Sequence, residues 1–167
     1  MRTKVSVTLC AALLVLSGAA QAEESATYTT RNLTVETALK AAQTAMHKCR
    51  DNGWQVAVAV VDRGGELQVM LRDRYAGAHT LETARGKAWT AASFRSDTGD
   101  IVQFIADNPE QQGLQQIDGA MMIGGGMMID AGGSLVGAIG VSGGPNPSID
   151  EACATAGIDA IEVDIQF

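Results

Sequence analysis

Short apolar runs separated by turn residues restrict the possible folds of this chain more than any other feature of its sequence. Residues 55–62 and 67–72 are rich in valine and leucine and flank an Arg-Gly-Gly-Glu turn, so they predict a β-hairpin. Residues 120–123, 127–130 and 135–141 are separated by glycine-rich segments and predict three more strands. Because strands joined by short turns run antiparallel, the sequence predicts a five-stranded, mainly antiparallel sheet.

Four further segments have the apolar spacing of amphipathic helices that would cover this sheet. With them, the element order becomes α-β-β-α-α-β-β-β-α, which predicts a single α+β domain. We expect the first two helices to be capped by Thr34 and Thr80, the third to start at Thr98, and the fourth to open with a capping box formed by Ser148 and Glu151. The first three helices are expected to end at Gly53, near Arg95 and before Asn108, respectively.

The amino-terminal segment has the pattern of a secretory signal peptide. Arg2 and Lys4 precede an apolar run over residues 5–16, and small residues follow it up to Ala22. The run is shorter than the about 20 residues of a permanent membrane span, and Cys10 lies inside it rather than at a lipoprotein position. We therefore expect cleavage near Ala22 and a periplasmic or secreted protein without a lipid anchor.

The rest of the chain has the length of one domain. Residues 23–32 are polar and expected to be flexible, and residues 33–167 would form the domain. Without the two basic residues of segment 1–22, the chain has ten basic and 19 acidic residues, so its formal net charge becomes −9. This charge argues against nucleic acid as a partner, and no later apolar stretch is long enough for membrane insertion.

Two cysteines and two histidines follow the expected cleavage site. Cys49, Cys153, His47 and His79 match none of the usual zinc-site spacings, so we expect no structural metal. In an oxidising compartment the cysteines would pair if their backbones lie within reach, but two buried thiols are equally ordinary. The sequence leaves both alternatives open.

The expected second helix has two unlike faces. An alanine-rich face belongs against the sheet, and the opposite face carries a strip of small residues between two aromatic side chains. One interpretation is a groove for a flat apolar ligand, with Thr90 or His79 approaching a metal at its centre. The alternative is close packing of another helix or subunit. The strip consists of Thr83, Gly86, Thr90 and Ser93, with Trp89 and Phe94 at its edges.

His47 is expected on the polar side of the first helix. It is either a solvated histidine or, because neutral imidazole is a good iron ligand, a second candidate for iron ligation beside His79. The glycine clusters lack the spacing of phosphate-binding loops, and Ser142 has no identifiable base, so neither nucleotide binding nor hydrolysis is indicated.

Five motifs resemble the GlcG/HbpS family, a haem-binding family of DUF336-type domains similar to the PduO C-terminal domain. They appear in the family's order and cover residues 33–160, nearly the whole expected mature chain. The motifs lie at residues 33–36 (Leu-Thr-Val-Glu), 58–65, 86–92 (Gly-Lys-Ala-Trp-Thr-Ala-Ala), 136–144 and 150–154.

The resemblance implies a homo-oligomer that binds haem b non-covalently, or another tetrapyrrole such as a corrinoid. Its role would be haem or iron storage, scavenging or sensing, with a periplasmic sensor kinase or redox enzyme as a partner. The alternatives are a haem-degrading enzyme and an accessory or structural protein without a ligand. No Cys-x-x-Cys-His is present, which excludes covalent c-type attachment. Thr90 matches the family's helix threonine, and the candidate cofactor-binding residues are Thr90, His79, His47, Thr83, Gly86 and Trp89.

Overall fold

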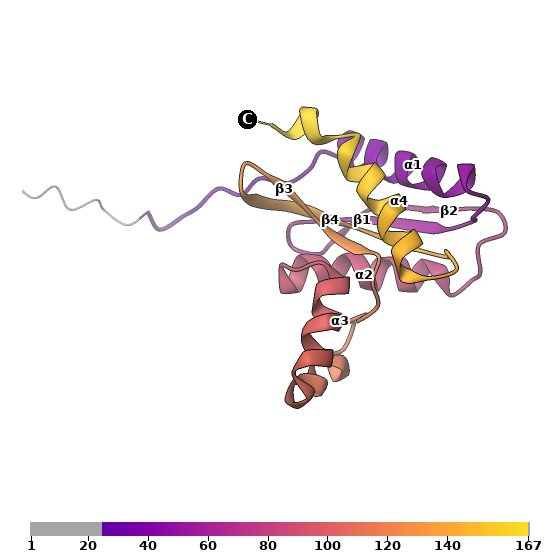
Figure 1. Ribbon diagram of the computed structural model, residues 1–167. Coiled ribbons are helices and arrows are strands. Elements are labelled where there is room, and N and C mark those ends of the chain that lie inside the picture. Colours follow the sequence, from indigo (N-terminus) through magenta and orange to yellow (C-terminus); the bar gives the residue numbers. More distant parts are fainter. Residues whose placement is uncertain (1–24, 167) are drawn as a thin grey trace, which may run out of the picture.

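A four-stranded antiparallel sheet forms the centre of the chain, with the strand order β2-β1-β4-β3 (Figure 1). The computed structural model describes residues 25–166, so the predicted signal peptide lies outside the described residues. The predicted hairpin is confirmed, because β1 and β2 pair directly. The strands are β1 (Ala57–Asp62), β2 (Leu67–Arg72), β3 (Gly126–Ala131) and β4 (Ser134–Ser142).

The fifth predicted strand is wrong. Residues 120–123 join no sheet, because their backbone makes other hydrogen bonds: the amide of Ala120 donates to Ile117, that of Ile123 donates to Met121, and that of Met121 donates to the hydroxyl of Thr90. A short apolar run cannot by itself distinguish a strand from a loop that packs on a helix. The α+β class is confirmed, with four strands in place of five.

Helices lie on both faces of the sheet, and one helical arm projects from it (Figure 1). α1 and α4 pack side by side on one face, and α2 covers the other. α3 and the 3-10 helix η1 form the arm, and a second 3-10 helix, η2, follows α4. The elements are α1 (Val35–Asp51), α2 (Thr80–Phe94), α3 (Thr98–Asp107), η1 (Pro109–Gln116), α4 (Pro147–Asp159) and η2 (Glu162–Ile165).

The observed first turns of the helices show that two of the predicted caps are wrong. Thr34 caps α1 as predicted, since its side chain accepts a hydrogen bond from the amide of Thr37. The predicted capping box of α4 is wrong, because the Asn146 side chain accepts from the amide of Ile149 and forms the cap. Thr80 does not cap α2 either: it is the first helical residue, and its hydroxyl donates to the carbonyl of a preceding glycine.

The two faces of the sheet are packed differently. Towards α1 and α4 the core holds Val, Ile, Met and Cys side chains, whereas towards α2 it consists almost entirely of alanines. Since alanine is small, α2 lies close to the sheet, and a Cβ atom on Gly140 of β4 would clash with the carbonyl of Ala84. The alanine-rich face of α2 is therefore directed at the sheet, as its spacing predicts.

A disulfide joins the two helices of the other face. Cys49 of α1 and Cys153 of α4 are both buried and bonded, with their Cα atoms 5.6 Å apart. The bond closes a sequence separation of 104 residues, which removes much conformational freedom from the unfolded chain. It connects two helices that lie near opposite ends of the domain's sequence.

Replacing both cysteines by alanine tests the contribution of this bond. We expect the free energy of unfolding to fall by about 2–5 kcal/mol, because the unfolded chain regains its freedom. Chemical denaturation under non-reducing conditions measures the change. A wild-type protein whose stability is unaffected by a reductant would contradict the expectation.

Candidate functional site

A cleft of about 490 Å³ opens where three elements meet. The first turns of α2 form one wall, the loop between β4 and α4 forms the opposite wall, and the loop after β2 reaches the rim. Its volume lies within the range of small-molecule sites. Among the lining residues are Gln55, Tyr75, His79, Thr83, Lys87, Ile123, Ser142, Gly144, Pro145, Pro147 and Asp150.

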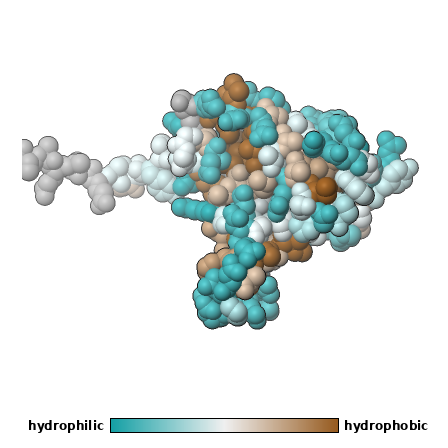
Figure 2. All heavy atoms as spheres, in the orientation of Figure 1, coloured by the Kyte–Doolittle hydropathy of each residue, from teal (hydrophilic) through white to brown (hydrophobic). Residues whose placement is uncertain are grey.

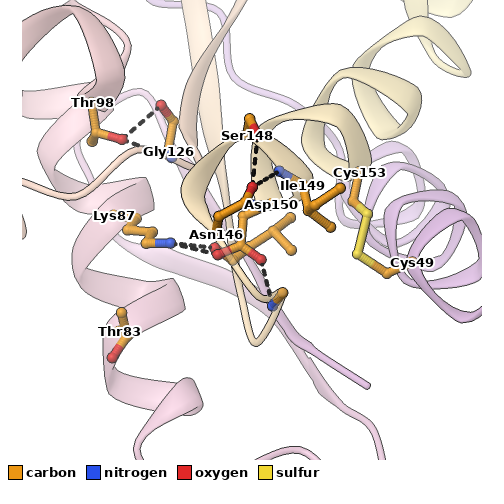
Figure 3. A network of polar contacts seen from close by, with 12 residues as sticks. Cys49, Thr83, Lys87, Thr98, Gly126, Asn146, Ser148, Ile149, Asp150 and Cys153 are labelled. Atoms are coloured by element: carbon orange, nitrogen blue, oxygen red, sulfur yellow. Dashed lines mark hydrogen bonds and ion pairs between the residues drawn. A yellow bond between two sulfur atoms is a disulfide. The ribbon is translucent and has the colours of Figure 1, made fainter. Parts of the chain in front are cut away.

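A buried ion pair forms the floor of the cleft (Figure 3). The ammonium of Lys87 lies 2.8 Å from Asp150 Oδ2 and also donates to the carbonyl of Val141 at 2.9 Å. The other oxygen, Asp150 Oδ1, accepts from the amide of Gly144. The side chains of Lys87 and Asp150 are 2% and 6% exposed, so each charge depends on the other for compensation. The pair fixes α2 to both ends of the β4–α4 loop.

The triple glycine at the start of β3, residues 124–126, makes room for this ion pair. A Cβ atom on Gly125 would lie 2.9 Å from Lys87 Nζ and 2.7 Å from Asp150 Cβ, and Gly125 also has a φ of 111°. A Cβ atom on Gly126 would clash with the carbonyl of Lys87. These glycines are therefore required by close approach of the backbone to the pair, and not only by a turn.

His79 lies at the rim of the cleft and His47 does not. His79 immediately precedes α2 and is exposed, with Thr83 of the next turn donating its hydroxyl to the His79 carbonyl. His47 is exposed on α1, which packs on the opposite face of the sheet. The two histidines therefore cannot ligate one ion within a single copy of the chain.

The small-residue strip of α2 divides into an open and a covered part. Thr83 lines the cleft, but Gly86 and Thr90 are buried beneath residues 119–121. The Thr90 hydroxyl donates to the Gly86 carbonyl at 2.7 Å and accepts from the amide of Met121 at 2.8 Å. A loop of the same chain therefore occupies the surface that the sequence suggested for a ligand or a second helix.

Trp89 packs away from the cleft. Its indole lies against the turn between β1 and β2, where a Cβ atom on Gly65 would come within 2.9 Å of Trp89 Cδ1. It does not line the cleft. Its position next to the strip on a helical wheel did not reveal this, because the β1–β2 turn that it contacts is distant in sequence.

The floor residues are the part of the site that sequence reasoning missed. Lys87 belongs to the quoted motif on α2 and Asp150 to that on α4, but neither was singled out as a site residue. A signal was present, because Lys87 lies next to Ala88 and one turn from Ala84 and Ala91, at the edge of the alanine-rich face. A lysine so close to a buried helix face requires a buried partner.

A second hollow near the start of α3 is lined by carboxylates. Asp97 accepts a hydrogen bond from the amide of Met128, and Asp100 and Glu151 lie around the same hollow. Burial raises the pKa of Asp97, the hydrogen bond from Met128 opposes this, and the charges of Asp100 and Asp130 add to the rise. Within residues 25–166 no group of three or more His, Cys, Asp or Glu residues has the arrangement of a metal site.

Replacing one member of the ion pair tests its burial. Lys87→Met leaves the Asp150 carboxylate buried without its counter-charge, so we expect a loss of about 3–5 kcal/mol in the free energy of unfolding. Adding Asp150→Asn should recover part of this loss, because the remaining amide is neutral and still accepts from Gly144. Chemical denaturation of the single and double variants measures the coupling.

The exposed pair of Lys40 and Asp164 provides the matched control. Its atoms are also 2.8 Å apart, but its side chains are 51% and 45% exposed. Lys40→Met should therefore cost less than about 1 kcal/mol. Equal losses for Lys87→Met and Lys40→Met would contradict the structural role of the buried pair.

Comparison with known proteins identifies the family. The model of the family described as "Haem degrading protein HbpS-like" matches residues 33–159. An uncharacterised 15.0 kDa protein of Citrobacter freundii, from the dhaT-dhaS intergenic region, is 32% identical over 114 residues, which are 67% of this chain and 80% of that protein.

Solved structures of similar proteins have the same fold. A double mutant of Streptomyces reticuli HbpS has a TM-score of 0.77 at 36% identity, covering 84% of this chain and 94% of that one. The Klebsiella pneumoniae protein ORFY has a TM-score of 0.78 at 26% identity, covering 83% and 96%, and a PduOC:Heme complex has 0.71 at 25%, covering 78% and 95%. The chain therefore belongs to the HbpS-like family.

Proposed function

We propose that this protein binds haem non-covalently, as haem b, in the cleft between α2 and the β4–α4 loop. The observation that carries the proposal is the position of His79, an exposed imidazole at the rim of a cleft of about 490 Å³. A relative of similar fold has been solved as a heme complex, which supports a tetrapyrrole ligand. Neutral imidazole is a common axial ligand of haem iron.

The cleft has both apolar and polar lining residues, which suits a flat ligand with an apolar body and polar edges. Ile123, Pro145 and Pro147 supply apolar surface, and Tyr75, a residue that is 79% exposed, lies at the rim. The His79 ring makes no hydrogen bond within the described residues, so its nitrogen atoms are available for ligation. Bound haem would supply an iron centre for redox chemistry, while His79 would hold and orient it.

Thr90 does not fit a direct role in this arrangement. Its hydroxyl is completely buried, and both hydrogen bonds that hold it are made inside the chain. Gly86 and Trp89 are likewise covered by or packed against other segments. Of the residues proposed from the sequence, His79 and Thr83 line the cleft, and His47 lies on the other face.

Titration of the purified protein with hemin, followed by the Soret band, tests this proposal. We expect saturable binding by the wild type and a dissociation constant raised at least about tenfold in His79→Ala, which corresponds to about 1.4 kcal/mol of lost ligation. His47→Ala is the matched control and should bind hemin as the wild type does. Loss of binding in His47→Ala with normal binding in His79→Ala would contradict the assignment.

The same complex separates binding from degradation, which the description of the family names. If the protein stores, scavenges or senses haem, the Soret band will persist after a reductant is added under air. Loss of the band with release of iron or a bilin would instead establish the enzymatic alternative. A protein that never shifts the Soret band would fit the accessory or structural alternative.

We further propose export through the signal peptide, residues 1–22. The Cys49–Cys153 disulfide supports this location, because such bonds persist in oxidising compartments. Among residues 25–166 no helix has the length and apolar character to cross a bilayer. The exported protein is expected to begin at Glu23, which amino-terminal sequencing measures. A sensor kinase or redox enzyme as its partner stays a prediction, which co-purification would test.

A homo-oligomer, which the resemblance implies, would use the arm formed by α3 and η1. Figure 2 shows mainly hydrophilic atoms at the lower end of this arm and hydrophobic atoms where it joins the body. Several large apolar side chains of the arm are nevertheless exposed, including Val102, Phe104 and Ile117. Phe104 also lines a hollow together with Phe94, Ile101 and Leu114, and an exposed apolar surface of this kind is typical of an interface.

Phe104→Glu tests this surface. We expect a smaller assembly by light scattering after gel filtration, because a buried charge disfavours association. Gln103→Glu adds the same charge at the neighbouring exposed position and should leave the mass unchanged. An unchanged mass for Phe104→Glu would show that the copies associate elsewhere.

A further inference from the structure

Three polar groups on the floor of the cleft have unused hydrogen-bonding capacity. They come from different elements: Lys87 from α2, Ser142 from the end of β4, and Gln55 from the residues before β1. The register places Ser142 opposite Ala57, two residues after Gln55. Close backbone contact supports this juxtaposition, because a Cβ atom on Gly143 would lie 2.7 Å from the Gln55 carbonyl.

Within the described residues, the Lys87 ammonium has one N–H group without a partner. A lysine ammonium carries three N–H donors, and two of them are used by Val141 and Asp150. The side chain is only 2% exposed and lines the cleft, so a group bound in the cleft can reach the third N–H while contact with bulk water is small. An unpaired donor on a buried charge is costly, and a ligand that accepts this hydrogen bond is favoured.

Gln55 and Ser142 supply complementary groups. The buried side-chain oxygen of Gln55 has no hydrogen-bond partner in the described part of the chain, so a donor at the cleft floor would satisfy it. The Ser142 hydroxyl also makes no hydrogen bond within residues 25–166, and it can donate or accept. The floor thus offers one donor, one acceptor and one group that is both.

We propose that this floor binds a small neutral molecule carrying hydroxyl groups, an alcohol or a polyol. One hydroxyl group can accept from Lys87, another can donate to Gln55, and Ser142 can pair with either, since all three residues line the same cleft. A carboxylate satisfies Lys87 but leaves Gln55 without a donor, and it places a second negative charge beside Asp150. The proposal concerns the floor only and does not depend on haem at the rim.

Saturation-transfer NMR with glycerol as the probe tests the proposal. We expect a glycerol signal that saturates in the millimolar range. 1,2-Dimethoxyethane retains acceptor oxygens but has no hydroxyl to donate to Gln55, and acetate carries the negative charge, so both should bind more weakly than glycerol. Each lost hydrogen bond should weaken glycerol binding roughly threefold to tenfold in Ser142→Ala and in Gln55→Leu.

Ser134→Ala is the matched control, since Ser134 lies in the exposed turn at the start of β4. It should bind glycerol as the wild type does. Circular dichroism confirms folding, and Ser142→Ala, which removes one oxygen atom, decides the result if Gln55→Leu does not fold.

The proposal is overturned by any of three results. These are no saturable glycerol signal, equal signals from dimethoxyethane or acetate, and unchanged glycerol binding in Ser142→Ala. None of them bears on haem binding, because the Soret titration of His79→Ala is read independently.

Discussion

The buried ion pair between Lys87 and Asp150 is the interaction on which the site depends. Two charges removed from water are stable only when each is neutralised and hydrogen-bonded, and here the remaining bonds go to Val141 and Gly144. The pair therefore specifies how α2, the end of β4 and the start of α4 meet. Because those three segments also enclose the cleft, its shape follows from the same requirement.

The two faces of the sheet are stabilised by different contacts. On one face, large aliphatic side chains of the strands pack against the alanines of α1 and α4, and the Cys49–Cys153 bond joins these two helices. On the other, alanines and Gly140 bring the backbone of α2 close to β4, which places Lys87 beside its partners at the end of β4 and the start of α4. The disulfide thus lies on the face covered by α1 and α4, and the cleft lies on the face covered by α2.

The loop over α2 explains why a helical wheel alone did not predict which residues of the strip are open to a ligand. Gly86 and Thr90 lie on the strip of α2 that faces away from the sheet, but residues 119–121 fold back and pack over them. Only the first turn, with Thr83 and the preceding His79, stays open to the cleft. The ligand proposed here therefore lies at one end of the strip and not along it.

Local periodicity was enough to predict most elements of this protein. The apolar stripe of α1, the β1–β2 hairpin and the alanine face of α2 follow from side-chain spacing alone, and the quoted motifs were enough to indicate the family. Contacts between distant segments decided the rest. The loop at residues 120–123, the Asn146 cap, the disulfide and the pairing of Lys87 with Asp150 all depend on groups brought together only by folding. A hydrogen bond or a counter-charge from a distant segment leaves no periodic pattern, so the cleft could be located only in the tertiary structure.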